Sequence, residues 1–245
     1  ALPISLMWVN NETGLETPIA EVTAIAAKYG IPVHSDAVAA FGHVPTNFQS
    51  SGLATMAISG HKIGSPVGVG ALIVARDAKL AVISHGGGQE RGIRSGTLSA
   101  PLAYTLAQAA ALAEAEREVL FSRLEKFRRQ IVESVMRVAP DANFTRGSEP
   151  GFAGIVHFTF PGCSGDSLLF LLDTAGVSVS TGSACRAGVA QASHVLRAMG
   201  RTEDQARGSL RISMGYTTTQ QDVDAFLEAF PAAYAGAHKA GLPSK

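Results

Sequence analysis

Short apolar runs separated by turn residues dominate the first part of the chain. Four of them occupy residues 3–9, 31–35, 53–58 and 69–75. Between the first two runs, apolar side chains recur at helical spacing, with Thr17 as the expected cap, Pro18 at the first helical position and Gly30 at the end. The pattern predicts strand, helix, strand, which is the crossover unit of a parallel sheet.

The remainder of the chain begins with a long helical pattern over residues 99–138, which Pro140 ends. Beyond it the pattern predicts strands at 153–160, 177–180 and 209–214, and helices at 166–175, 193–199 and 219–237. The expected fold is therefore α/β, with a mostly parallel sheet followed by a smaller α+β domain. The expected boundaries are 1–100 for the large domain, 101–138 for a connecting helix and 139–245 for the small domain.

Polar residues follow three of the predicted strands at their carboxyl ends: Asn11, Asp36 and the segment 59–62. In open α/β sheets this edge forms the binding crevice, so these residues are expected to converge. Lys62 lies in a tight loop between two buried strands, where a restricted and partly desolvated amine can act as a nucleophile. A solvated surface lysine is the alternative interpretation of the same loop.

A glycine-rich segment at 85–97 contains three consecutive glycines, which forbid regular structure, and two arginines, Arg91 and Arg94. Exposed backbone amides next to arginines suit an anion. A flexible surface loop explains the same composition equally well.

Cys185 lies in a loop of small residues at 180–188, directly after a predicted strand and next to Arg186. The neighbouring positive charge favours the thiolate, which is the nucleophilic form of cysteine. Cys163 also lies in a turn, but it has no basic neighbour in sequence. A free cysteine is more often a small apolar core residue, and that alternative stays open for both positions.

Composition narrows the classes of partner. Of the 245 residues, 46% are hydrophobic and 16% are charged, and 20 basic residues balance 20 acidic ones. No net charge therefore draws the chain to nucleic acid or to an anionic membrane. Two cysteines do not make a disulfide framework, which indicates a reducing compartment. Neither a membrane-spanning run nor a leader segment is present, so we expect a soluble, cytoplasmic protein.

Several short motifs resemble, in order and spacing, the cysteine desulfurases of the NifS/IscS type. They are Val-Asn-Asn-Glu-Thr-Gly at 9–14, His-Ser-Asp-Ala at 34–37, Ser-Gly-His-Lys at 59–62, the glycine-rich segment at 85–97, Ser-Thr-Gly-Ser-Ala-Cys at 180–185 and Ser-Leu-Arg-Ile-Ser at 209–213. Members of that family are fold-type I, class V pyridoxal-phosphate enzymes that supply sulfur for iron–sulfur clusters and thiolated tRNA. The resemblance extends from the first residue to the last predicted helix.

The resemblance implies a set of residues that bind pyridoxal 5'-phosphate. Lys62 is similar to the lysine that binds the cofactor covalently and moves the substrate's Cα proton, and Asp36 to the carboxylate facing the pyridine nitrogen. Ser59 and His61 resemble phosphate ligands, and Thr97 resembles the residue that reaches the phosphate of the neighbouring subunit's cofactor. A homodimer follows from that last similarity.

The resemblance also implies the substrate site and the reaction. Asn11 is similar to an amide near cofactor and substrate, and Arg211 to the arginine that binds the substrate carboxylate, which its planar fork fits. Cys185 would attack the sulfur of L-cysteine and carry it as a persulfide while L-alanine leaves. The implied partners are iron–sulfur scaffold or other sulfur-acceptor proteins. No intrinsic metal is implied, and Cys185 would contact iron only in a transient iron–sulfur cluster.

Two departures from the family pattern affect these expectations. Ala39 replaces a glutamine that bonds the cofactor, a loss of about 0.5–1.5 kcal/mol. Family members also carry an earlier segment, with a phosphate-cradling loop and a histidine that stacks on the cofactor. We expect a chain lacking this N-terminal portion of the enzyme to bind pyridoxal phosphate poorly and turn over little. The alternatives are a selenocysteine lyase, another class V transferase, or a non-catalytic docking module.

Overall fold

The computed structural model describes residues 3–181 and 192–241, which divide into two compact units. The first unit comprises Ala1–Val9 and Thr17–Glu118, and the second comprises Asn10–Glu16 and Val119–Lys245. The short segment Asn10–Glu16 thus belongs to the second unit, although the chain on both sides of it belongs to the first.

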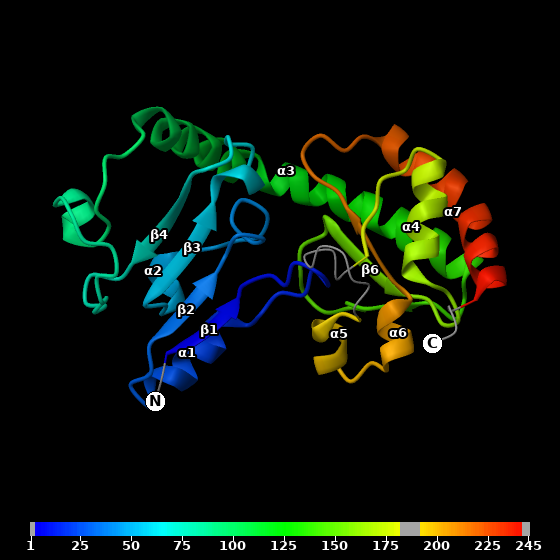
Figure 1. The fold of residues 1–245 in the computed structure, drawn as a ribbon, viewed down its shortest axis with the longest axis horizontal. Helices are drawn as coiled ribbons and strands as arrows, with labels where there is room; N and C mark the ends of the chain where they lie inside the picture. Colours follow the sequence, from blue (N-terminus) through cyan, green and yellow to red (C-terminus); the bar gives the residue numbers. More distant parts are fainter. Residues whose placement is uncertain (1–2, 182–191, 242–245) are drawn as a thin grey trace. The chain divides into compact units, whose positions relative to one another are not determined.

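The first unit is built on a four-stranded sheet with the order β1-β2-β3-β4 (Figure 1). Its strands are β1 (Ile4–Met7), β2 (Val33–Asp36), β3 (Thr55–Ser59) and β4 (Gly70–Val74). The first three strands are parallel and β4 is antiparallel to β3. Helices α1 (Ile19–Ala27) and α2 (Phe48–Ser51) connect the parallel strands in turn. The expected α/β fold with a mostly parallel sheet is confirmed.

The start of α1 differs from the expectation that Thr17 caps it. Pro18 occupies the N-cap position and no side chain bonds the free amides there. The hydroxyl of Thr17 instead donates to the carbonyl of Met7 at 2.7 Å. The expected cap is therefore wrong, because the end of β1 offers this hydroxyl an acceptor.

The glycine-rich segment is mostly irregular, with one 3₁₀ turn, η2 (Gln89–Gly92). A second 3₁₀ turn, η1 (Gly60–Lys62), follows β3 directly. Helix α3 (Ala100–Val138) then begins in the first unit and ends in the second. Its predicted length is confirmed to within one residue at the start.

Gly42 fits a narrow gap between α3 and the loop that carries Lys62. Its φ is +75°, and a Cβ there would lie 2.8 Å from the Cβ of Ala113 and 3.1 Å from Cγ2 of Ile63. Both the backbone conformation and the space therefore favour glycine. Gly42 therefore lies close both to α3 and to Ile63, the residue that directly follows Lys62.

We expect Gly42→Ala to lower the free energy of unfolding by about 1–3 kcal/mol, since it adds an overpacked methyl group to a strained backbone. Gly30→Ala is the matched control, because Gly30 has a φ of +64° but nothing within 4 Å of a Cβ. Urea unfolding of both variants measures the difference. Equal losses in the two variants would show that the gap around Gly42 contributes nothing.

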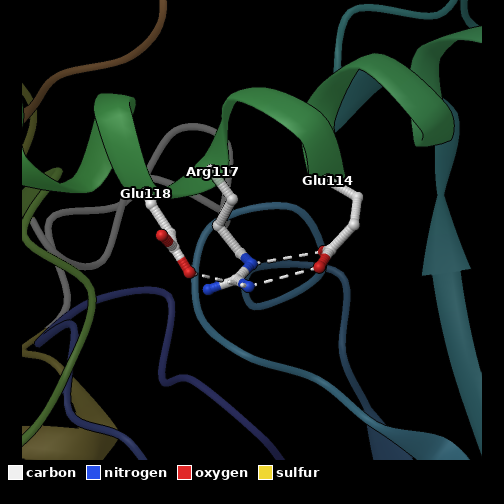
Figure 2. Close-up of polar contacts among 3 residues, drawn as sticks. All are labelled: Glu114, Arg117 and Glu118. Atoms are coloured by element: carbon white, nitrogen blue, oxygen red, sulfur yellow. Dashed lines mark hydrogen bonds and ion pairs between the residues drawn. The ribbon is translucent and has the colours of Figure 1, made fainter.

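Arg117 of α3 pairs with two glutamates of the same helix, Glu114 and Glu118 (Figure 2). Arg117 donates to both carboxylate oxygens of Glu114 at 3.2 Å, and its Nη2 lies 3.9 Å from Glu118. The Glu114 and Glu118 side chains are 57% and 87% exposed, so water screens both pairs. Each pair therefore adds at most about 1 kcal/mol to the helix.

The second unit has a three-stranded antiparallel sheet with the order β5-β6-β7. Its strands are β5 (Asn143–Phe144), β6 (Ile155–Thr159) and β7 (Ser209–Ser213), and its helices are α4 (Gly165–Thr174), α5 (His194–Ala198), α6 (Glu203–Arg207) and α7 (Gln220–Ala240). Helices α4 and α7 pack side by side (Figure 1). The predicted small α+β domain architecture is thus present, with β5 and α6 as elements that the sequence pattern did not indicate.

Apolar side chains of α3 and a row of phenylalanines form the core of the second unit. Leu124, Phe127, Ile131 and Val135 of α3 are all buried, which confirms the predicted apolar face. The ring of Phe158 lies 5.3–5.7 Å from its aromatic neighbours, measured between centroids. This tight packing gives β6 a rigid environment, and all its residues are buried.

The predicted strand at 177–180 is wrong: within these residues the structure has one isolated bridge, between Ser180 and Arg211. Of the helices in the described ranges 3–181 and 192–241, none is long and apolar enough to cross a membrane.

Candidate active site

The end of β3 and the turn that follows it carry three of the predicted cofactor residues, Ser59, His61 and Lys62. The Gly60 amide donates to the carbonyl of Val69 at 2.9 Å, which closes the loop across β4. The hydroxyl of Ser59 lies 2.7 Å from Nδ1 of His61. The structure therefore brings the two predicted phosphate ligands together as a hydrogen-bonded pair.

Asp36 ends β2 at the same carboxyl edge of the sheet, with Ala57 of β3 as its partner in register. Its Oδ1 accepts a hydrogen bond from the Val38 amide at 2.9 Å, which fixes the orientation of the half-buried carboxylate. The other oxygen, Oδ2, receives no hydrogen bond from any described residue. An oriented carboxylate with one free oxygen suits a protonated ring nitrogen.

Lys62 is exposed, and among the described residues its amine forms no ion pair. The expected partial desolvation of this amine is therefore not provided by the first unit. The sequence interpretation missed His43, which forms a hydrogen bond with the backbone of Lys62. Burial lowers the pKa of His43, and the positive charge of Lys62 lowers it further, whereas the hydrogen bond raises it. A neutral imidazole thus forms a hydrogen bond with the backbone of the turn that carries Lys62.

Thr97 is exposed and lies on a cavity of about 640 Å³ in the first unit. Glu90 and Arg94 of the glycine-rich segment line the same cavity, together with residues of β4 and the start of α3. A carboxylate and a guanidinium at one cavity give it mixed charge. The anion site expected from the glycines and arginines stays a prediction.

Arg211 and Asn11, the predicted substrate residues, are brought together within the second unit. Nη1 of Arg211 donates to the backbone carbonyl of Asn11 at 2.8 Å. The backbone of Arg211 also pairs with Ser180 through two hydrogen bonds, of 2.7 and 3.0 Å. The half-buried guanidinium is thus fixed at Nη1, its Nε is buried without a hydrogen-bond partner among the described residues, and a guanidinium with such free donors can bind a carboxylate.

His157 lies directly opposite Arg211 in the register of β6 and β7, so their side chains share a face of the sheet. The imidazole is fully buried, and its Nδ1 lies 2.8 Å from the hydroxyl of Thr145. Burial lowers the pKa of His157 to about 4, and the charge of Arg211 adds to this. His157 is therefore a neutral neighbour that adds no second positive charge beside the arginine.

We expect this buried histidine to make stability depend on pH. Between pH 6.5 and about 4 the unfolded chain binds a proton at this position and the folded chain does not, so stability falls as pH falls. The loss from pH 7 to pH 5 should be about 2 kcal/mol. Urea unfolding at both pH values, compared with His157→Gln, isolates this contribution. An unchanged pH dependence in the variant would contradict it.

Cys185 lies outside the described residues, whereas Ser180 before it and Ser193 after it are described. Cys163 is fully buried, with its Sγ 3.8 Å from Nδ1 of His238. Burial raises the pKa of the Cys163 thiol, and the Asp141 carboxylate adds to this. Cys163 therefore behaves as a core residue and not as a nucleophile.

Residues 3–226 match the family model of the class-V aminotransferases. The chain belongs to this family. Class-V aminotransferases are pyridoxal-phosphate enzymes, and the solved relatives have the fold-type I architecture.

Similar proteins share most of this chain. An IscS-like cysteine desulfurase of Mycobacterium tuberculosis is 50% identical over 98% of this chain and 61% of that protein. Cysteine desulfurase IscS of Methanosarcina thermophila is 39% identical over 93% of this chain and 56% of that protein. The X-ray structure of a NifS-like protein from Rickettsia africae superposes with a TM-score of 0.85 and 32% identity, over 94% of this chain and 61% of that one. The chain therefore spans less than two thirds of the length of these relatives.

The residues of the first unit fit the family cofactor chemically. Three kinds of group lie at or just after the carboxyl ends of the adjacent parallel strands β2 and β3. They are the exposed amine of Lys62, the oriented carboxylate of Asp36 and the hydrogen-bonded pair of Ser59 and His61. These are the groups that bind an aldehyde, a ring nitrogen and a phosphate. Within residues 3–181 and 192–241, no group of three or more His, Cys, Asp or Glu side chains is placed to hold a metal ion.

Proposed function

We propose that this chain carries the lysine, arginine and thiol of a cysteine desulfurase, which converts L-cysteine to L-alanine and transfers the sulfur to Cys185 as a persulfide. Relatives that are named cysteine desulfurases, at up to 50% identity, support this assignment over a plain aminotransferase. An aminotransferase requires no thiol, whereas this reaction requires one.

In the proposed site, residues of the first unit hold pyridoxal phosphate. Lys62 binds it covalently and then moves a proton at the substrate's Cα, while Asp36 stabilises the protonated ring nitrogen. Ser59 and His61 bind the phosphate. Thr97 reaches the phosphate of a second subunit, so we propose a homodimer. When bound, the cofactor supplies the electron sink for negative charge next to Cα.

Residues of the second unit bind the substrate and take its sulfur. Arg211 binds the carboxylate of L-cysteine, with Asn11 beside it. The Cys185 thiolate attacks the substrate sulfur, a new S–S bond forms and the Cβ–S bond breaks. The electron pair stays with the substrate carbon, and protonation of that carbon gives the methyl group of alanine. An iron–sulfur scaffold or another acceptor protein then removes the sulfur from Cys185.

One observation carries the proposal: Arg211, the carboxylate-binding residue, pairs through its backbone with Ser180. Ser180 lies five positions before Cys185 and at the start of the segment that contains it. The residue that would bind one end of the substrate is thus hydrogen-bonded to the segment that would take sulfur from the other end.

The test is the stoichiometry of the reaction. The purified protein, loaded with pyridoxal phosphate, should form one alanine for each sulfur released from L-cysteine in the presence of a thiol reductant. Selenocysteine offered in parallel separates this activity from that of a selenocysteine lyase, which should prefer it strongly. Consumption of L-cysteine without alanine would refute the proposal.

A further inference from the structure

The segment Asn10–Glu16 folds into a compact turn that points Glu12 inward. Oδ1 of Asn10 accepts hydrogen bonds from the amides of Glu12 and Thr13, at 3.0 and 2.9 Å, and from the Thr13 hydroxyl at 3.1 Å. The amide of Asn10 donates to the carbonyl of Leu15 at 2.9 Å. A single asparagine side chain thus fixes the start of the turn. Glu12 is consequently only 6% exposed, which is unusual for a carboxylate.

The partner of this buried carboxylate lies far away in sequence. Oε2 of Glu12 accepts a hydrogen bond from the hydroxyl of Ser193 at 2.5 Å, across 181 positions of the chain. Ser193 is 2% exposed and is the N-cap of α5, where its oxygen accepts from the Leu196 amide at 3.2 Å. One hydroxyl therefore satisfies both the carboxylate and the first turn of the helix.

The same turn also holds the predicted substrate arginine. The carbonyl of Asn11, the residue before Glu12, accepts the hydrogen bond from Arg211. A displacement of Glu12 would move this carbonyl, and with it the guanidinium. The turn thus connects the arginine of β7 with the first residue before α5.

We propose that Glu12 is a positioning residue: through Ser193 it fixes the start of α5, and through the neighbouring carbonyl of Asn11 it fixes Arg211. The part of this role that positions Arg211 for the substrate rests on the proposed function. The link between the turn and α5 is a property of the second unit and can be measured without any reaction.

Hydrogen exchange of the purified protein tests the link in both directions. Glu12→Ala should speed exchange of the Leu196 amide about tenfold, and Ser193→Ala should speed exchange at Glu12 and Thr13 by a similar factor, because each removes one end of a charge-assisted hydrogen bond. Glu12→Gln keeps an acceptor oxygen and should restore most of the protection. If Glu12→Ala leaves Leu196 unchanged, the proposal is wrong.

Ser164→Ala is the matched control, because Ser164 caps α4 of the same unit through the Ser167 amide and binds no carboxylate. It should speed exchange in α4 and leave Glu12 and Thr13 at the wild-type rate. A general loosening of the unit would instead speed exchange at all these positions in every variant, which would overturn the proposed specific link.

Kinetics tests the substrate role separately. If the wild-type protein turns over L-cysteine, Glu12→Ala should raise KM about tenfold with kcat within about threefold, since the carboxylate site shifts and the reacting groups stay. Glu12→Gln should rescue the KM. A fall in kcat at unchanged KM would overturn the role on Arg211. If the wild-type protein consumes L-cysteine without forming alanine, the proposed function fails, and hydrogen exchange alone decides the link.

Discussion

Lys62→Ala is expected to abolish covalent binding of pyridoxal phosphate and to lower the rate of alanine formation by more than about a thousandfold. The amine is the proposed attachment point and the group that moves the Cα proton, and a positioned acid–base group alone contributes about 10²–10⁴ to a rate. Borohydride reduction followed by peptide mass spectrometry should locate the pyridoxyl group on Lys62 in the wild-type protein and nowhere in the variant.

The fold should tolerate this substitution, because Lys62 is exposed and its amine forms no ion pair among the described residues. The Tm of Lys62→Ala should therefore match that of Lys79→Ala, an exposed lysine of the same unit, which should retain full activity. Lys62→Arg keeps the charge but lacks a nucleophilic amine, so it should be as inactive as alanine. Normal turnover in either Lys62 variant would remove this lysine from the mechanism.

Local patterns predicted the first unit well, because its elements are specified by neighbouring residues. Apolar runs of four to eight residues bounded by turns gave its parallel strands, and their carboxyl ends gave the positions of Asp36 and the Lys62 turn. The same reasoning failed for residues 177–180, where alternating valine and serine favours a strand. Only Ser180 forms a bridge there, because a segment with a strand-like pattern becomes a strand only where another segment pairs with it.

Contacts between distant positions could not be predicted. Nothing near Glu12 in sequence indicates that a serine 181 positions later receives its carboxylate. The sequence placed His157 only within the predicted strand at 153–160, and the register of β6 and β7 shows that it lies opposite Arg211. An isolated histidine between buried apolar residues was the one available signal that it stays neutral. The partner of Glu12 depends on how its turn packs against α5, and that of His157 depends on how β6 pairs with β7. A single sequence specifies neither contact.

Exposure gave the opposite result to the expectation at Lys62, for a similar reason. The flanking strands suggested a desolvated amine, but Lys62 in the turn after β3 is exposed, and the next residue, Ile63, is buried close to Gly42 instead. Burial of a side chain depends on which element covers it. The residues on either side of a loop do not decide this.

Cys185→Ser is expected to leave pyridoxal phosphate bound to Lys62 and to lower sulfur transfer by at least about a thousandfold, as removal of a nucleophile does in other enzymes. A serine hydroxyl contains no sulfur and cannot form the S–S bond, so the substrate's sulfur has no acceptor and its bond to Cβ is not broken. Mass spectrometry after a single turnover should find one added sulfur atom on the peptide of Cys185 in the wild-type protein and none in the variant.

Cys163→Ala is the control that makes this result specific. Burial raises the pKa of the Cys163 thiol, so little thiolate exists there at neutral pH, and its fully buried sulfur cannot meet a substrate. The variant should lose some stability, because a buried group is removed, yet retain persulfide formation on Cys185. Added sulfur on Cys163 in the Cys185→Ser protein would mean that the core thiol is reached, and that the small-residue segment is not the acceptor.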